Sequence, residues 1–179
     1  MEYFDIYDEN RIKTGRTIPR GTPLSGEDHR LVVHICIFTP DGQMIIQQRQ
    51  PFKHGWSNMW DLSAGGSVRA GETSREGALR EVSEELGLVL PKNALRKTVT
   101  IYSDNVFDDH YTAVYGGGLS GLVLQKEEVQ AVKTASADEI KQMIKEGIFI
   151  PYNENYIDLL FYLKDSIGMR TAADKTVQI

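Results

Sequence analysis

Residues 66–88 read GSVRAGETSREGALREVSEELGL, and the second half of this stretch predicts the best-defined helix of the chain. Its apolar residues recur at helical spacing. They are Ala78, Leu79, Val82 and Leu86. Gly87 stands where a C-terminal helix cap is expected. We therefore predict a helix over residues 73–86 that follows a glycine-rich loop.

Three carboxylates of this helix share one face. At about 100° per residue, Glu81, Glu84 and Glu85 fall within an arc of about 100°. Like charges at these spacings repel one another, and the helix dipole disfavours anions near the C-terminal end. A bound cation would remove both costs. Ligand sets made only of oxygen select magnesium or manganese, and magnesium usually completes its shell with substrate phosphates. The alternative is an ordinary solvated acidic surface, the usual explanation for an isolated Glu-Glu pair.

Length and composition set broad limits. A chain of 179 residues with 41% hydrophobic residues suits a single domain, predicted here over residues 1–179. Its longest uncharged apolar stretch, residues 31–38, is far short of the roughly 20 residues of a membrane helix. The N-terminus lacks a signal-peptide pattern and Cys36 is the only cysteine, so we expect a cytoplasmic protein without membrane contact. The net charge of −5 argues against broad nucleic-acid binding.

Residues 1–24 are predicted to form an N-terminal β-hairpin extension. Apolar and aromatic positions in residues 3–6 precede a turn at Asp8-Glu9-Asn10, and a second extended segment follows. The segment also carries the clearest local excess of basic residues, namely Arg11, Lys13, Arg16 and Arg20. A solvated surface is the ordinary explanation of this excess, and contact with phosphate is the alternative.

The rest of the chain predicts an α/β fold with helices packed on a mixed sheet. Residues 31–38 and 44–47 are expected to form a central hairpin across a Pro-Asp-Gly turn. Residues 60–63 form a short extended segment before Gly65. Further strands are predicted over residues 97–102, 110–115, 119–124 and 129–134, helices over residues 136–146 and 153–166, and fraying over the last ten residues.

The helix and the loop before it carry a longer pattern. It consists of Gly66, Glu72, Arg80, Glu81, Glu84, Glu85 and Gly87, with apolar residues at Val82 and Leu88. This spacing matches the Nudix box at every position, and a chance match in a chain of this length is on the order of one in a million. The chain therefore resembles the Nudix hydrolases.

The resemblance implies a fold, a reaction and a metal site. The fold would be an α/β/α sandwich, and the reaction would be cleavage of a nucleoside diphosphate linked to another moiety, by a pyrophosphatase that uses Mg²⁺ or Mn²⁺. By matching positions, Glu84 and Glu85 look like the principal metal ligands, and the carbonyl of Gly65 would add another. Glu81 would hold or deprotonate a metal-bound water.

The resemblance also implies supporting roles around the carboxylates. Arg80 is placed with Glu81 and Glu84 among the catalytic residues because it would pair with Glu72 and hold the Gly66 loop against the helix. Gly77 projects onto the carboxylate face, where a missing side chain would leave room for water or phosphate. The general base is left open, with Glu127 and Glu128 as candidates for a base or a ligand. A solvated loop is the alternative for both.

Segments outside the box resemble the isopentenyl-diphosphate-isomerase-like branch of the family. These are residues 3–15, 32–49 and 60–66. Isomerases of this type carry Cys-Gly-His-Pro where this chain has Gly65-Gly66-Ser67-Val68, so the isomerase cysteine is missing. We therefore favour hydrolysis of a small-molecule diphosphate, with an isomerase-like enzyme and a non-catalytic nucleotide-sensing module as alternatives. The resemblance is also compatible with a homodimer.

Some side chains outside the box have two readings. His34 alternates with Val33 and Ile35 on a predicted strand and would face either a substrate pocket or the core, the more frequent place for a lone histidine. Trp56, Trp60 and Tyr111 could stack on a base, although packing is the commoner role of aromatic residues.

Overall fold

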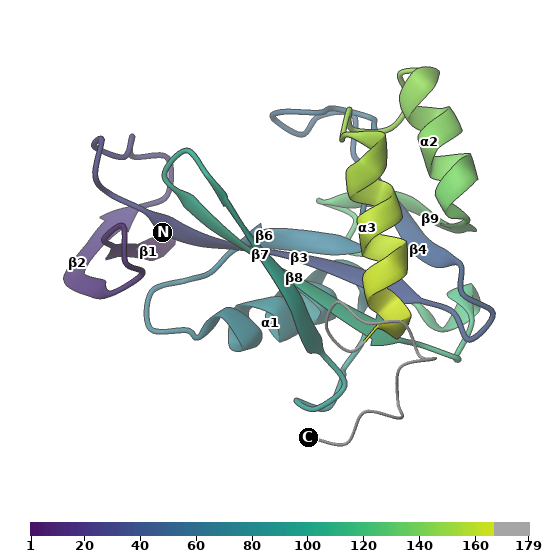
Figure 1. Ribbon diagram of the computed structural model, residues 1–179, viewed down its shortest axis with the longest axis horizontal. Coiled ribbons are helices and arrows are strands. Elements are labelled where there is room, and N and C mark those ends of the chain that lie inside the picture. The colour runs from purple at the N-terminus through teal and green to yellow at the C-terminus, as the bar shows by residue number, and fades with distance from the viewer. Residues whose placement is uncertain (167–179) are drawn as a thin grey trace, which may run out of the picture.

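A mixed sheet of seven strands forms the centre of the molecule (Figure 1). The computed structural model describes residues 1–166, so the predicted fraying of the last ten residues lies outside the described part. The strands are β3 (Arg30–Phe38), β4 (Met44–Arg49), β5 (Trp60–Asp61), β6 (Ala64–Ser67), β7 (Arg96–Ser103), β8 (Val106–Val114) and β9 (Val129–Ala135). Their main order is β5-β4-β3-β8-β7, with β6 paired to β3 and β9 paired to β4. Strands β3 and β8 run parallel, and the other pairs are antiparallel.

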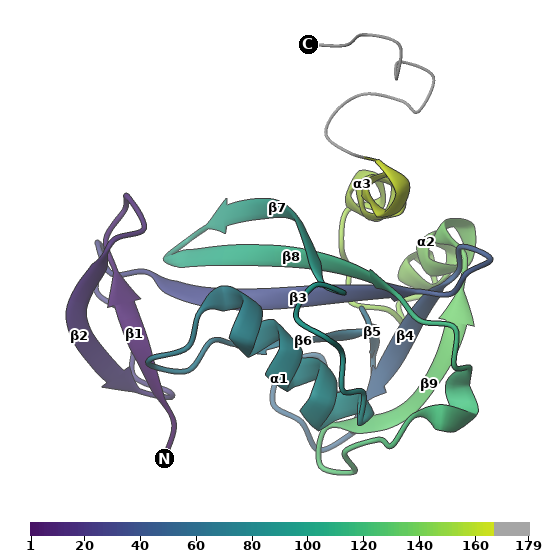
Figure 2. The same cartoon turned by 90° about the horizontal axis from the view of Figure 1, so that it is seen from below.

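Helices cover both faces of this sheet, as Figure 2 shows. Helix α1 (Ser74–Leu86) packs on one face, and α2 (Ala137–Lys145) and α3 (Glu154–Asp165) pack on the other. Side chains of β3 point alternately to the two faces of the sheet and contribute to a hydrophobic core on each. Val33 and Ile35 pack with α1, whereas Cys36 packs with α2 and α3. The predicted α/β/α sandwich is confirmed. No helix within residues 1–166 is long and apolar enough to cross a membrane.

Helix α1 begins and ends where its sequence predicts. The Thr73 hydroxyl accepts a hydrogen bond from the Glu76 N–H, and the Glu76 side chain accepts one from the Thr73 N–H. Gly87 ends the helix in the left-handed conformation, with φ of 67°. These caps hold the face that carries the three glutamates in a defined register.

The predicted N-terminal hairpin is present as a separate two-stranded sheet, β1 (Tyr3–Tyr7) and β2 (Lys13–Pro19). It lies at one end of the molecule, beyond the start of β3 (Figure 1). The Ala70 N–H donates to the Tyr3 carbonyl at 2.7 Å, so the hairpin is joined to the loop that precedes α1.

The strand predicted over residues 119–124 is wrong. Residues Leu119–Gly121 form a short 3₁₀ helix, and the chain continues irregularly. The backbone N–H groups that a strand would use bond elsewhere, because Val123 donates to the carbonyl of Leu86 at 3.0 Å and Gln125 donates to that of Glu85 at 3.1 Å. These bonds satisfy carbonyls at the end of α1, which an isolated helix leaves open. The other predicted strands and helices are present, with ends that differ by a few residues.

Candidate active site

The three glutamates of α1 line one pocket of about 460 Å³ together with β6, β3 and the hairpin. Their exposure differs although they are near neighbours in sequence. Glu85 is buried, the Glu81 side chain is 12% exposed, and the Glu84 side chain is 38% exposed. The face predicted from helical spacing therefore runs from the interior to the mouth of a pocket.

Glu85 is held deepest. Its Oε2 accepts hydrogen bonds from Gln47 Nε2 at 2.9 Å and from the Gly65 N–H at 3.2 Å. Burial raises the pKa of Glu85 to about 8, and the charge of Glu81 acts in the same direction. Burial also raises the pKa of Glu81. Two crowded carboxylates whose ionised forms are disfavoured suit a bound divalent cation, because a cation favours the charged form.

Arg80 connects the helix to the loop before it. Its guanidinium donates to both carboxylate oxygens of Glu72, at 2.7 and 3.0 Å, and to the Ser67 carbonyl at 3.0 Å. It also donates to Glu81 Oε1 at 2.8 Å and to Glu84 Oε2 at 3.1 Å. The expected Arg80–Glu72 pair is thus present, and the same side chain also fixes two of the candidate metal ligands.

Two glycines permit close contacts beside the carboxylates. A Cβ atom on Gly66 would lie 2.3 Å from Glu81 Oε1, so this position admits only glycine unless the carboxylate moves. The expectation for Gly77 is wrong. This glycine is buried, and a Cβ atom there would lie 3.0 Å from Val68 Cγ2 and 3.4 Å from Glu72 Oε2. Gly77 therefore allows the loop to pack on α1 and does not clear space for a ligand.

Basic side chains from several elements line the same pocket. They are Arg20, Arg30, Arg49, Lys53 and Arg69, in addition to Arg80. Burial lowers the pKa of Arg30, and the charge of Arg20 acts in the same direction. Positive charges brought together in this way favour an anionic ligand such as phosphate. Their scattered sequence positions do not predict that these side chains converge. Of this set, Arg20 alone lies in the basic segment for which phosphate contact is an alternative.

The other basic residues of the hairpin are used elsewhere. Lys13 pairs with Asp5 at 2.6 Å, and Arg16 pairs with Asp28. The solvated-surface explanation thus suits Lys13 and Arg16, whereas Arg20 lines the pocket and Arg11 pairs with the buried carboxylate of Asp109.

The two candidate loop glutamates separate in space. Glu128 lines the pocket and pairs with Lys53. Glu127 is exposed and is not among the described residues that form the pocket wall. Glu128 is therefore positioned to reach a ligand in the pocket, whereas Glu127 is not.

The histidine and the three aromatic residues for which two roles are open also differ in where they lie. His34 lines the pocket with a side chain that is 21% exposed. Tyr111 is buried, with its hydroxyl 2.9 Å from Ser74 Oγ, and Trp60 is partly buried against the core cluster that includes residues of α2 and α3. Trp56 is 52% exposed and lies outside the pocket. Of these side chains, only the histidine faces the candidate site.

Comparison with known proteins identifies the family. The model of the NUDIX domain matches residues 28–155. The chain belongs to the Nudix family. An uncharacterized Nudix hydrolase of Listeria monocytogenes is 42% identical over 166 residues, which cover 93% of this chain and 97% of that protein. An isopentenyl-diphosphate Delta-isomerase of Halorhodospira halophila is 29% identical over 89 residues, about half of each chain.

Solved structures show the same fold. A Deinococcus radiodurans protein aligns with a TM-score of 0.72 at 22% identity and covers 90% of this chain and 99% of its own. The Nudix domain of Shewanella oneidensis NrtR, complexed with ADP ribose, aligns with a TM-score of 0.55 at 19% identity over 80% of this chain and 88% of its own. A bifunctional NMN adenylyltransferase/ADP ribose pyrophosphatase of Francisella tularensis aligns with a TM-score of 0.60 at 18% identity over 80% of this chain and 43% of its own.

Membership of the Nudix family confirms the expected fold class and the expectation of a hydrolase that acts on pyrophosphate bonds. Nudix hydrolases generally require a divalent metal and act on small nucleotide-like molecules.

Proposed function

We propose that this Nudix protein is a divalent-metal-dependent pyrophosphohydrolase that cleaves the diphosphate linkage of a nucleoside diphosphate derivative by attack of water on phosphorus. The observation that carries the proposal is the convergence of Glu81, Glu84 and Glu85 with basic side chains in one pocket. Carboxylates hold the metal and the basic side chains hold the phosphates in such an arrangement.

The residues present suit magnesium or manganese. Glu84 and Glu85 would be the main ligands, with Glu81 and the carbonyl of Gly65 beside them. The buried, mutually repelling carboxylates described above are the observation that supports this assignment. When bound, the metal would make a coordinated water more acidic and neutralise charge on the phosphate oxygens.

The protein residues have separate tasks in this proposal. Glu81 or Glu128 would accept the proton of the attacking water, since both line the pocket. Arg80 would keep the ligands in place through Glu72. Arg30 and Arg69 would bind phosphate oxygens and orient the substrate.

ADP ribose is the first substrate to test, because one protein of the same fold is complexed with ADP ribose and another is an ADP ribose pyrophosphatase.

We further propose a single domain over residues 1–179 with the hairpin extension at 1–24, a cytoplasmic location, no nucleic-acid partner and a homodimer. Light scattering on the purified protein tests the oligomeric state.

The isomerase alternative is weaker. Where the isomerases have their cysteine this chain has Gly65, and Cys36 is fully buried, which raises the pKa of its thiol. A ligand-sensing role would require no turnover, and the complete set of box carboxylates argues for turnover.

The test is release of nucleotide and phosphate from a panel of diphosphate compounds by the purified protein with magnesium. The panel contains ADP ribose, nucleotide sugars, dinucleotides, nucleoside triphosphates and isopentenyl diphosphate. We expect Glu85→Gln to lower turnover by at least about 100-fold, because the change keeps the shape and removes the charge. Glu9→Gln, at an exposed glutamate outside the pocket, is the matched control. Wild-type activity in Glu85→Gln would overturn the site assignment, and isomerisation without hydrolysis would establish the alternative reaction.

A further inference from the structure

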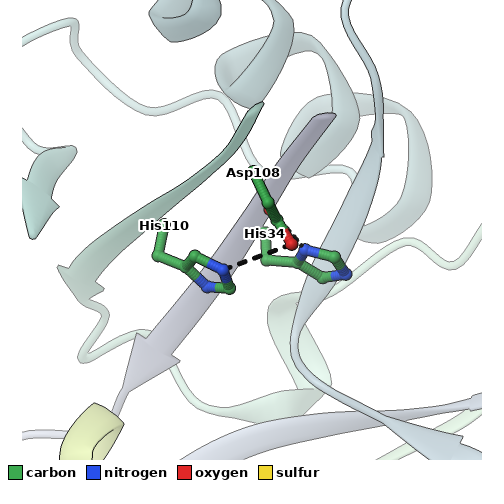
Figure 3. Close-up of side chains that lie close together, drawn as sticks. All are labelled: His34, Asp108 and His110. Atoms are coloured by element: carbon green, nitrogen blue, oxygen red, sulfur yellow. Dashed lines mark hydrogen bonds and ion pairs between the residues drawn. The ribbon is translucent and has the colours of Figure 1, made fainter. Parts of the chain in front are cut away.

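A second polar cluster lies on two neighbouring parallel strands, beside the box but separate from its glutamates (Figure 3). His34 is on β3, and Asp108 and His110 are on β8. The register pairs His34 with His110, and Asp108 precedes His110 by two residues, so all three side chains leave the same face of the sheet. The two imidazole rings stack with their centroids 5.2 Å apart.

The carboxylate lies between the two imidazoles, as Figure 3 shows. Asp108 Oδ1 is 2.8 Å from His34 Nδ1, and Asp108 Oδ2 is 3.3 Å from His110 Nε2. One ligand atom from each residue lies within 4.8 Å of the others. Around a metal with bonds of about 2.1 Å, neighbouring ligand atoms lie about 3.0 to 3.4 Å apart. The two Asp108–histidine separations are therefore close to the spacing of a coordination shell.

One ring nitrogen of His110, Nε2, is buried 3.3 Å from the Asp108 carboxylate. The His110 side chain is 1% exposed, and among residues 1–166 this nitrogen has no hydrogen-bond partner of acceptable geometry. The other ring nitrogen, Nδ1, lies 3.0 Å from the Tyr156 hydroxyl on α3. When Nδ1 donates its proton to that oxygen, the lone pair of Nε2 faces the Asp108 carboxylate. A buried lone pair opposite a carboxylate is unfavourable unless a cation lies between them.

The contact with Tyr156 is also what a metal-binding histidine requires. Such histidines usually donate their second ring N–H to an oxygen, which fixes the tautomer and the orientation of the ring. Tyr156 is partly buried and is supplied by a different element from the three candidate ligands. The cluster thus has both candidate ligands and an outer contact that orients one of them.

We propose that His34, Asp108 and His110 bind one divalent transition-metal ion of the zinc, cobalt or iron class. Two imidazoles and one carboxylate suit these metals, whereas magnesium prefers oxygen alone. The ion joins β3 to β8 and, through Tyr156, to α3. His34 also lines the active-site pocket, so the ion fixes one wall of that pocket. This site is independent of the proposed hydrolysis and differs from the glutamate site in its ligands.

Cobalt is the probe, because its visible absorption reports nitrogen and oxygen ligands directly. Metal-free protein is titrated with Co²⁺ in the presence of excess Mg²⁺, which occupies sites made only of oxygen. We expect one equivalent of Co²⁺ with a visible spectrum in wild type and in Glu84→Gln/Glu85→Gln. We expect at least a tenfold weaker affinity in His34→Gln, in His110→Gln and in Asp108→Asn. His54→Asn, at an exposed histidine, is the matched control and keeps full binding.

A second measurement on the unchanged protein guards against misfolding of the variants. Nitrogen NMR of the imidazoles with and without Zn²⁺ follows all four histidines in the wild-type chain. Selective shifts of His34 and His110, with those of His29 and His54 unchanged, support the site. The proposal is overturned if Co²⁺ binding survives in folded His34→Gln, if it disappears only in the glutamate variant, or if Zn²⁺ leaves His34 and His110 unshifted. Any of these results would leave a cluster without metal, in which His34 is hydrogen-bonded to Asp108.

Discussion

At the scale of the residue, two chemically identical side chains of α1 differ in exposure and contacts because of their positions along the helix. Glu84 lies at the mouth of the pocket against Arg69 and Arg80, whereas Glu85 is buried against Gln47 and the Gly65 N–H. A helix turns by about 100° per residue, so adjacent glutamates necessarily enter different environments. The buried one carries the larger electrostatic cost in the metal-free protein.

That cost makes stability depend on pH. The pKa of Glu85 is raised from 4.5 to about 8 on folding, so the folded state binds more protons than the unfolded state between these values. The free energy of unfolding of metal-free protein therefore falls as the pH rises from about 5 to about 8, by an amount on the order of a few kcal/mol. Urea unfolding in EDTA at several pH values measures this dependence.

Glu85→Gln should remove most of the dependence, because glutamine stays neutral. A smaller slope of the same sign remains from Glu81, whose pKa is also raised. Magnesium should reverse the loss of stability at pH 8 in wild type and have little effect in the variant. Equal slopes for the two proteins would mean that Glu85 does not titrate in this range.

At the scale of the element, α1 is held by its own caps and by a distant loop. Gly87 ends the helix with φ of 67°, and a Cβ atom there would lie 2.7 Å from Val123 Cβ and 2.9 Å from the Val123 carbonyl oxygen. The same loop donates backbone N–H groups to the carbonyls of Leu86 and Glu85. The loop thus stabilises the helix end that carries the proposed metal ligands.

We expect Gly87→Ala to lower the free energy of unfolding by about 2 to 4 kcal/mol. The alanine would have to adopt a left-handed conformation and displace the loop backbone. Gly26→Ala is the control, because nothing lies within 4 Å of its Cβ position and its φ is not left-handed. Denaturant unfolding of both variants gives the comparison, and equal stabilities would contradict the role given to the Val123 contact.

At the scale of the whole molecule, the pocket is assembled from parts that are far apart in the chain. The hairpin supplies Glu2 and Arg20, β3 supplies Arg30, and the box supplies Arg69. Glu2 pairs with Arg20 at 2.6 Å and with Arg69 at 2.7 Å, so it connects the hairpin to the box. The pocket wall that we propose binds phosphate, formed by Arg20, Arg30 and Arg69, therefore depends on how the hairpin and the sandwich are joined.

We predict that Arg30→Gln raises KM for the diphosphate substrate by about 10- to 100-fold, because a charge-assisted hydrogen bond to phosphate contributes about 1.5 to 3 kcal/mol. The value of kcat should change much less. Arg16→Gln is the control, because Arg16 pairs with Asp28 outside the pocket. Steady-state kinetics on the best substrate of the panel gives KM and kcat for both variants. A fall in kcat at unchanged KM would place Arg30 at the reacting phosphorus instead of on the bound phosphates.

Much of the fold and part of the candidate site could be predicted from local patterns. The caps of α1, its carboxylate face, the alternation of β3 and the turn of the hairpin are encoded within a few residues, and a period of 3.6 or 2 is sufficient to read them. Arg80 and Gly66, which both contact Glu81, belong to the same short motif. The strand prediction for residues 119–124 is wrong because the chain turns locally at Leu119–Gly121, and the Val123 N–H donates to the Leu86 carbonyl at the end of α1 and not to a neighbouring strand.

The sequence by itself determined the helix, its three glutamates and the family, since these depend on spacing along one segment. Only the tertiary structure decided which basic side chains reach the pocket, that Glu128 and not Glu127 faces it, and that His34 meets Asp108 across 74 positions of the chain. These outcomes depend on strand order and register. A shift of one residue in the β3–β8 register would misalign His34 and His110, and no pattern within either strand alone sets that register.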